Sequence, residues 1–132
     1  MIAIDTNVLL RLIVADDAPQ LEIARELVFK ARVFVPLTVT LECERVLRSF
    51  YKYPRRAIAD AISATTQLDS VTFEQIDGVR WALRQFVAGA DFADMIHLLQ
   101  AAAARVSSFA TFDDGIADKA GPGTPLPIEA LA

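Results

Sequence analysis

The sequence predicts an α/β fold in which a mostly parallel sheet lies between layers of helices. Two observations support this prediction. Short apolar runs typical of strands alternate with longer segments whose apolar residues recur at helical spacing. No internal repeat, low-complexity tract or linker interrupts this alternation, and 132 residues is an ordinary length for one domain. We therefore expect a single domain over residues 1–132.

The first predicted strand, Ile2 to Ile4, is fully apolar, as in a strand buried on both faces of a parallel sheet. It ends at Asp5, after which apolar residues recur at helical spacing as far as Ile13. A second helix is expected to begin near Pro19, since proline suits a first helical turn. The other strands are expected at residues 33–35, 69–73, 109–111 and 126–128, and the other helices at residues 38–51, 54–67, 74–87 and 91–105.

Composition limits the class of protein. A hydrophobic content of 54% excludes a disordered chain, and no segment reaches the roughly 18 apolar residues of a membrane span. Met1 leads directly into the first strand, so no cleavable leader is expected. The single cysteine, Cys43, excludes an internal disulfide framework and favours a reducing cytoplasm. The net charge of −4 argues against a nucleic-acid partner held by overall charge, but not against one held by a local patch or a metal.

Acidic residues follow two of the predicted strands. Asp5 comes directly after the first strand, and Asp113 comes shortly after the strand at 109–111. Ligands bind at the carboxyl ends of strands in open α/β sheets, but an acid at this position also caps the helix that follows. Both interpretations of Asp5 stay open. Asn7 and Thr111 are short polar residues suited to holding a carboxylate or a metal-bound water.

Two predicted helices carry further acids beside apolar residues. Glu42 borders the apolar stripe of the helix at 38–51, whereas Glu44 falls on the far side and is expected to be solvated. The helix at 91–105 is apolar almost all round and is expected to pack in the interior. Asp91 and Asp94 share its first turn, where we interpret Asp91 mainly as a cap and Asp94 as the chemical group. His97 is interpreted as a packing residue, with a role in assisting catalysis left open.

The carboxyl ends of parallel strands meet at one edge, so these acids are expected to converge there. Two like charges ~5 Å apart at an effective dielectric of ~20 repel by roughly 3 kcal/mol. Four such groups would therefore rival the ~5–15 kcal/mol stability of a domain, unless they bind protons or a cation. Oxygen ligands without cysteine or organised histidine favour Mg²⁺ or Mn²⁺ over zinc. Such an ion can activate water and neutralise charge on a phosphodiester.

The same residues occur in an order that resembles the PIN-domain family, specifically the VapC-type toxins of bacterial toxin–antitoxin systems. The resemblance is carried by IDTNVLLRL, VPLTVTLECERVLRSFYK, ADFADMIHLLQAAAA and FATFDD. It implies a three-layer α/β/α fold with about five mostly parallel strands. It also implies a Mg²⁺- or Mn²⁺-dependent endoribonuclease, usually a homodimer, that is neutralised by a small DNA-binding antitoxin.

The resemblance also assigns site residues. The family's acidic quartet falls on four positions, namely Asp5, Glu42, Asp94 and Asp113. In this interpretation Asp5, Asp94 and Asp113 anchor a metal directly or through water, and Glu42 positions or deprotonates the attacking water. Asp91 matches an extra acid of a subgroup and is a further candidate ligand. The polar supporting positions are Thr6, Asn7 and Thr111.

A basic run is expected to meet RNA phosphates. Its members are Arg45, Arg48, Lys52, Arg55 and Arg56, with Arg11 a further candidate. The alternative is that these residues form the solvated face of amphipathic helices. Phe50, Tyr51 and Tyr53 interleave with the run and could stack on unpaired bases, although they could instead belong to the core or to a groove that accepts the antitoxin.

Two other functions stay open. One is a receiver-like or phosphatase-like domain with acids at strand ends. A receiver-like domain would need a lysine at a late strand end, but the only late lysine, Lys119, lies beyond the last acid. A phosphatase-like domain would need an aspartate two residues after Asp5, but Asn7 occupies that position. The other is a non-catalytic scaffold of PIN-like fold, in which the acids serve only to bind a partner.

Overall fold

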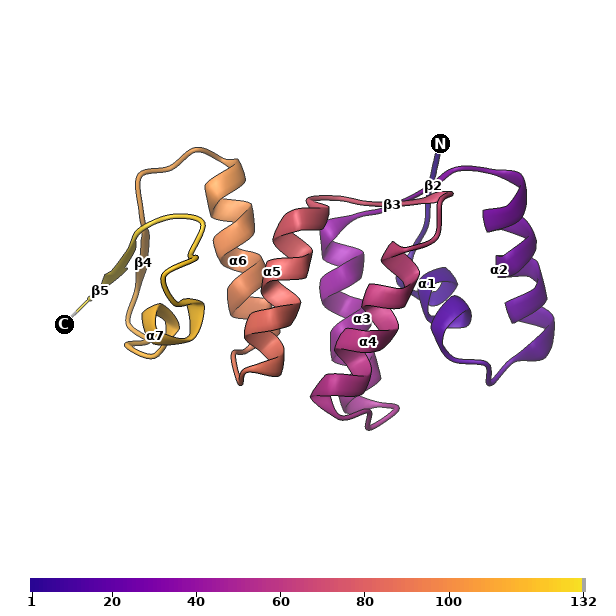
Figure 1. The fold of residues 1–132 in the computed structure, drawn as a ribbon, viewed down its shortest axis with the longest axis horizontal. Coiled ribbons are helices and arrows are strands. Elements are labelled where there is room, and N and C mark those ends of the chain that lie inside the picture. The colour runs from indigo at the N-terminus through magenta and orange to yellow at the C-terminus, as the bar shows by residue number, and fades with distance from the viewer. Residues whose placement is uncertain (132) are drawn as a thin grey trace. The chain divides into compact units, whose positions relative to one another are not determined.

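The computed structural model describes residues 1–131, which form α-helices and parallel β-strands (Figure 1). The strands are β1 (Ile2–Ala3), β2 (Val33–Val35), β3 (Val71–Phe73), β4 (Phe109–Thr111) and β5 (Ile128–Ala130). The helices are α1 (Thr6–Ile13), α2 (Ala18–Lys30), α3 (Leu37–Ser49), α4 (Arg55–Thr66), α5 (Ile76–Val87), α6 (Phe92–Ala103) and α7 (Ile116–Ala120). The predicted α/β class is confirmed. The last strand begins two residues later than expected, and α7 contains Lys119, which was expected in a helix or a turn without predicted bounds.

The chain divides into two compact units, which we describe separately. The N-terminal unit, Met1–Ile76, contains the first three strands and α1 to α4. Its sheet has the order β1-β2-β3, with Ile2 opposite Val33 and Val33 opposite Val71 in parallel register. The C-terminal unit begins at Asp77 and contains a second parallel sheet, in which β4 pairs with β5.

The expectation that the first strand is buried on both faces is wrong. Ile2 is 48% exposed and Ala3 is also exposed, while Ile4, just beyond the strand, is only 4% exposed. The reason is topological, because β1 lies at the edge of the three-stranded sheet and pairs with β2 alone within it. A short edge strand does not need apolar neighbours on both faces.

Helix packing forms the core of the N-terminal unit. The helix α1 packs against α2, α3 and α4, and α4 also contacts α3 and β3. Leu9, Leu47 and Ile58 are fully buried in these contacts. Cys43, on α3, is also fully buried, and burial, aided by the charge of Glu44, raises the pKa of its thiol to about 12. Cys43 is therefore a packing residue rather than a reactive thiol.

Close packing within the C-terminal unit depends on small residues. A Cβ atom on Gly78 of α5 would lie 2.7 Å from Cδ2 of Leu99 on α6, so only glycine fits without movement of the leucine. The rings of Phe86 and Phe92 meet edge to face with centroids 5.7 Å apart. Trp81 of α5 lies against the loop at Gly123, where an added Cβ would be 3.4 Å from the indole nitrogen. The contacts of Leu99 and Phe92 hold α6, the helix that begins with Asp91 as its N-cap and carries Asp94 in its first turn.

No helix among residues 1–131 has the length and apolar character needed to cross a membrane.

Candidate active site

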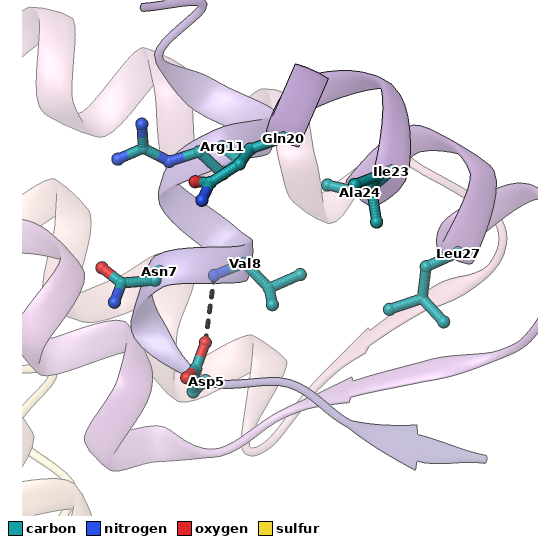
Figure 2. Close-up of a pocket in the computed structure, with 8 residues that line it drawn as sticks. All are labelled: Asp5, Asn7, Val8, Arg11, Gln20, Ile23, Ala24 and Leu27. Carbon is teal, nitrogen blue, oxygen red and sulfur yellow. Dashed lines mark hydrogen bonds between the residues drawn. The ribbon is translucent and has the colours of Figure 1, made fainter. Parts of the chain in front are cut away.

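Asp5 is the N-cap of α1. Its backbone is extended (φ −90°, ψ 179°), and the Val8 N–H donates to Oδ1 at 3.0 Å (Figure 2). The capping interpretation is thus confirmed, and the side chain is also exposed. A carboxylate has two oxygens and several acceptor positions, so this one bond does not exhaust its capacity to bind a ligand.

A cleft of about 310 Å³ opens beside Asp5, between α1 and α2. Asp5, Asn7 and Arg11 provide its polar lining, and side chains of α2 such as Ile23 and Leu27 provide much of its apolar wall (Figure 2). The carboxylate of Asp5 thus lies at the edge of this largely apolar cleft.

Arg11 is held within the N-terminal unit rather than extended into solvent. Nη1 forms a salt bridge with Oδ1 of Asp16 at 2.7 Å, and Nη2 donates to the hydroxyl of Tyr51 at 3.2 Å. The Tyr51 hydroxyl in turn donates to Oδ2 of Asp16 at 2.9 Å. The hydrogen bond to Tyr51 raises the pKa of Arg11, against the lowering effect of burial. Nε of Arg11 is buried without a partner among residues 1–131.

The two glutamates of α3 differ in their exposure to solvent. Glu42 is exposed, but Glu44 is only 2% exposed, so the expectation that Glu44 is solvated is wrong. Its Oε2 accepts a bond from Nε of Arg48 at 2.7 Å. The helix packs against both α1 and α4, and for this reason it buries more of its circumference than one apolar stripe.

The start of α3 depends on Glu74, a residue that was not predicted to belong to the site. Pro36 occupies the N-cap position and makes no side-chain capping bond. Instead, the Leu37 N–H donates to Oε1 of Glu74 at 2.8 Å. Glu74 follows β3 and is far from Leu37 in the sequence, so its position after a strand was the only available signal. It helps to orient the helix that carries Glu42.

Three of the predicted acids share one cavity in the C-terminal unit. Asp91, Asp94 and Asp113 line a hollow of about 210 Å³ together with Lys119, a residue not predicted to belong to the site. Asp91 is the N-cap of α6 as expected, because the Asp94 N–H donates to its Oδ1 at 3.0 Å. Asp113 follows β4 and accepts from the Gly115 N–H at 2.8 Å.

The supporting residue Thr111 fixes this second acidic turn. Its hydroxyl oxygen accepts a bond from the Asp113 N–H at 2.9 Å. Together with the bond from the Gly115 N–H, this contact sets the backbone and the carboxylate of Asp113 in one orientation. Thr6 and Asn7 lie at the start of α1, and Asn7 lines the same cleft as Asp5.

The electrostatics of Asp94 distinguish it from the other acids. Burial raises the pKa of Asp94, the charges of Asp91 and Asp113 raise it further, and His97 lowers it. His97 is exposed, so the expectation that it packs in the interior is wrong, and α6 buries one face rather than its whole circumference. Negative charge is therefore concentrated around Asp94, where a proton or a cation would relieve the repulsion.

The donor chemistry suits a hard divalent cation, since the acids offer only oxygen. The arrangement of these ligands in space is less favourable than their chemistry. Among residues 1–131, no group of three or more histidine, cysteine, aspartate or glutamate side chains is arranged to hold a metal ion. Asp91, Asp94 and Asp113 share a cavity within the C-terminal unit, while Asp5 and Glu42 belong to the N-terminal unit.

Apart from Arg11 on α1, the predicted basic residues lie between the second half of α3 and the start of α4. Arg48 is paired with the buried Glu44, and Arg56 approaches Asp60 at 3.5 Å. Phe50 is 74% exposed, so the alternative that it belongs to the core is wrong.

Comparison with known protein families shows the family to which the chain belongs. The profile of the PIN domain matches residues 2–122, a stretch that includes every acid described above. The chain belongs to the PIN-domain family. Comparison with curated proteins gives no match.

PIN domains form a nuclease-like family and generally use divalent metal ions. The acids of this PIN domain therefore occur in a fold that serves nucleic-acid hydrolysis, which favours this function over a receiver-like or phosphatase-like domain.

Proposed function

We propose that this PIN domain is a Mg²⁺- or Mn²⁺-dependent endoribonuclease toxin of the VapC type. The observation that carries the proposal is the gathering of Asp91, Asp94 and Asp113 around one cavity, with a raised pKa at Asp94, in a chain that matches the PIN domain. Like charges accumulate at a cost in stability, so the cluster is best explained by a cation that it binds.

In this proposal the acids have different roles. Asp5, Asp94 and Asp113 hold the metal, Glu42 positions or deprotonates the attacking water, and Asp91 orients Asp94 through its cap. When bound, the metal supplies positive charge at the scissile phosphate and makes a coordinated water more acidic. Thr111 keeps Asp113 in one orientation, as its bond to the Asp113 N–H supports. Thr6 and Asn7 support the site from the start of α1.

The remaining features of the proposal concern partners and assembly. We propose RNA as substrate, a DNA-binding antitoxin as inhibitor, a homodimer as the working form and the cytoplasm as its location. We also propose that residues 1–132 act as one domain. The family match supports this last point because it runs through both compact units without interruption.

The test is RNA cleavage by the purified protein with Mg²⁺ or Mn²⁺, comparing the wild type with Asp5→Asn. Asparagine caps a helix about as well as aspartate, so the fold should be preserved within a few tenths of a kcal/mol. We expect the cleavage rate to fall by more than about 100-fold, since even groups that only orient metal ligands are worth about 10- to 100-fold.

The matched control is Asp17→Asn. Asp17 caps α2 through the Gln20 N–H at 3.1 Å, just as Asp5 caps α1, but it follows no strand. This variant should cleave at the wild-type rate. Full activity in Asp5→Asn, or equal losses in both variants, would contradict the proposed site.

A second candidate function is the non-catalytic scaffold. It is favoured by one observation, that the described residues 1–131 contain no complete group of metal ligands. For a scaffold we expect no metal-dependent cleavage by the wild type under any condition.

A further inference from the structure

We propose that the turn between α3 and α4 binds unpaired RNA, with the ring of Phe50 as a stacking face for a base and the surrounding cations as phosphate contacts. The inference rests on the proposed function and adds to it the form in which the RNA is bound. We call the residues Arg45, Phe50, Lys52 and Arg55 the stacking turn.

The charge of this segment is opposite to that of the whole chain. Residues 45–56 include five of the 13 lysines and arginines and no aspartate or glutamate, in a protein of net charge −4. Neither Arg45 nor Lys52 forms a salt bridge with any other described residue in 1–131. A local concentration of cations in an acidic protein is the charge pattern expected for a polyanion bound at one place.

Phe50 presents an exposed aromatic ring within this basic segment. It is 74% exposed, and its one described ring contact is edge to face with Tyr51, with centroids 4.9 Å apart and planes at 76°. Tyr51 makes a second edge contact with Tyr53 at 6.3 Å. An edge-to-face contact occupies only the edge or one face of a ring, so part of the ring surface stays available. Any nucleobase can stack on such a surface.

Backbone hydrogen bonds tie the residues after Phe50 back to α3. Lys52 has a left-handed backbone (φ +60°), and the N–H groups of Tyr51 and Tyr53 donate to carbonyls in the last turns of α3, those of Val46 and Leu47. A binding surface that is already ordered loses less entropy when a ligand binds.

Tyr51 also connects the stacking turn to α1. Its hydroxyl is bonded to both Arg11 and Asp16, and Arg11 lines the cleft that contains Asp5. Arg11 is therefore a positioning residue for the turn rather than a direct phosphate contact. This network lies wholly within the N-terminal unit, so an RNA strand held at Phe50 is bound to the same unit as Asp5.

Unpaired RNA fits this surface better than a duplex or a protein. In a duplex the base faces are stacked on one another and cannot reach a protein ring, whereas loops and ends can. A protein partner would be expected to cover contiguous apolar area, but Arg48 and Lys52 lie two residues to either side of Phe50 in the sequence.

The test is equilibrium binding of a labelled, unpaired RNA in EDTA, measured by fluorescence anisotropy so that cleavage plays no part. We expect Phe50→Leu, which keeps an apolar group but removes the ring, to weaken binding by about tenfold or more. Phe50→Trp should bind as tightly as the wild type or more tightly. A fully paired, blunt-ended RNA duplex should bind more weakly than the unpaired RNA and should not distinguish the three proteins.

The matched control is Phe29→Leu, because Phe29 is 90% exposed but lies on α2. It should leave affinity unchanged. Wild-type affinity in Phe50→Leu would overturn the proposal. A change of oligomeric state in Phe50→Leu, seen by size-exclusion chromatography without a change in RNA affinity, would also overturn it and would identify a protein interface.

The outcome is separable from that of the proposed function. Metal-dependent cleavage by the wild type with no effect of Phe50 refutes only the stacking turn. Ring-dependent binding without cleavage by the wild type refutes only the nuclease.

Discussion

Asp5 and Asp91 show that an aspartate that caps a helix can still bind a ligand through its carboxylate. Each accepts a backbone N–H at 3.0 Å, and each stands at a cleft or cavity with other polar groups. The sequence left these two roles as competing interpretations for Asp5. The geometry makes them compatible, because capping occupies part of the acceptor capacity of the carboxylate and fixes its direction.

Asp94 should cost the folded protein stability at neutral pH when no metal is present. Its pKa is raised in the folded state, so between the unfolded and folded pKa values the folded protein binds more protons. Stability from this protonation is present below the folded pKa and is lost as the pH rises through it. We expect Asp94→Asn to have a higher Tm than the wild type at neutral pH in EDTA, by a few degrees at most because solvent screens the partly exposed group.

Thermal unfolding at several pH values tests this expectation. The advantage of Asp94→Asn should shrink as the pH falls and the wild-type carboxyl is protonated. Addition of Mg²⁺ or Mn²⁺ should stabilise the wild type more than the variant, since a ligand that binds only the folded state shifts unfolding by mass action. A variant less stable than the wild type at neutral pH in EDTA would contradict this account of Asp94.

At the scale of the elements, the helix α3 connects stability with the site, because its start is capped by Glu74 and its surface carries Glu42. We expect Glu74→Ala to lower the free energy of unfolding by about 1–2 kcal/mol, the usual value of a lost cap or a charge-assisted bond. Glu74→Gln, which keeps an acceptor oxygen, should lose less. Urea unfolding of the three proteins measures the differences.

A control for this experiment is Glu22→Ala on the exposed surface of α2. It should change stability by no more than about 0.5 kcal/mol. If Glu74→Ala were as stable as this control, the bond from the Leu37 N–H would contribute nothing to α3.

Elements were predictable where periodicity is local. The alternation of strands and helices follows from spacing alone, so all five strands were expected close to their observed places. Burial was less predictable because it depends on neighbours that are distant in sequence. Glu44 is covered because α3 has two helical neighbours, Ile2 is exposed because β1 is an edge strand, and Phe50 is exposed because α3 ends there.

The ion pair between the buried Glu44 and the exposed Arg48 changes the choice of variants for RNA binding. Reversing the charge of Arg48 would leave a carboxylate that is 3% exposed without its cation, and the fold would suffer together with any RNA contact. Arg45 and Lys52 are the better positions, because their substitution removes charge without breaking a described salt bridge.

At the scale of the whole molecule, the types of the site residues could be predicted, but their full geometry could not. Asp5, Glu42, Asp94 and Asp113 are separated by long stretches of chain, and the sequence identifies the four together through the resemblance to the PIN-domain family. The strands that precede Asp5 and Asp113 and the first turn that holds Asp94 are further signals. The cavity shared by Asp91, Asp94 and Asp113 agrees with this reasoning. Lys119 was missed as part of that cavity, since nothing in its local sequence shows that α7 brings it there.

The buried thiol of Cys43 and the indole of Trp81 provide one intrinsic reporter in each unit, because the sequence has no other cysteine or tryptophan. Rates of thiol labelling would follow transient opening around α3, while tryptophan emission would follow the loss of packing around α5. If residues 1–132 act as one domain, both signals should change at the same denaturant concentration. Separate midpoints would reveal two independently melting halves, and a nuclease whose halves melt separately could be silenced by a partner that merely loosens one of them.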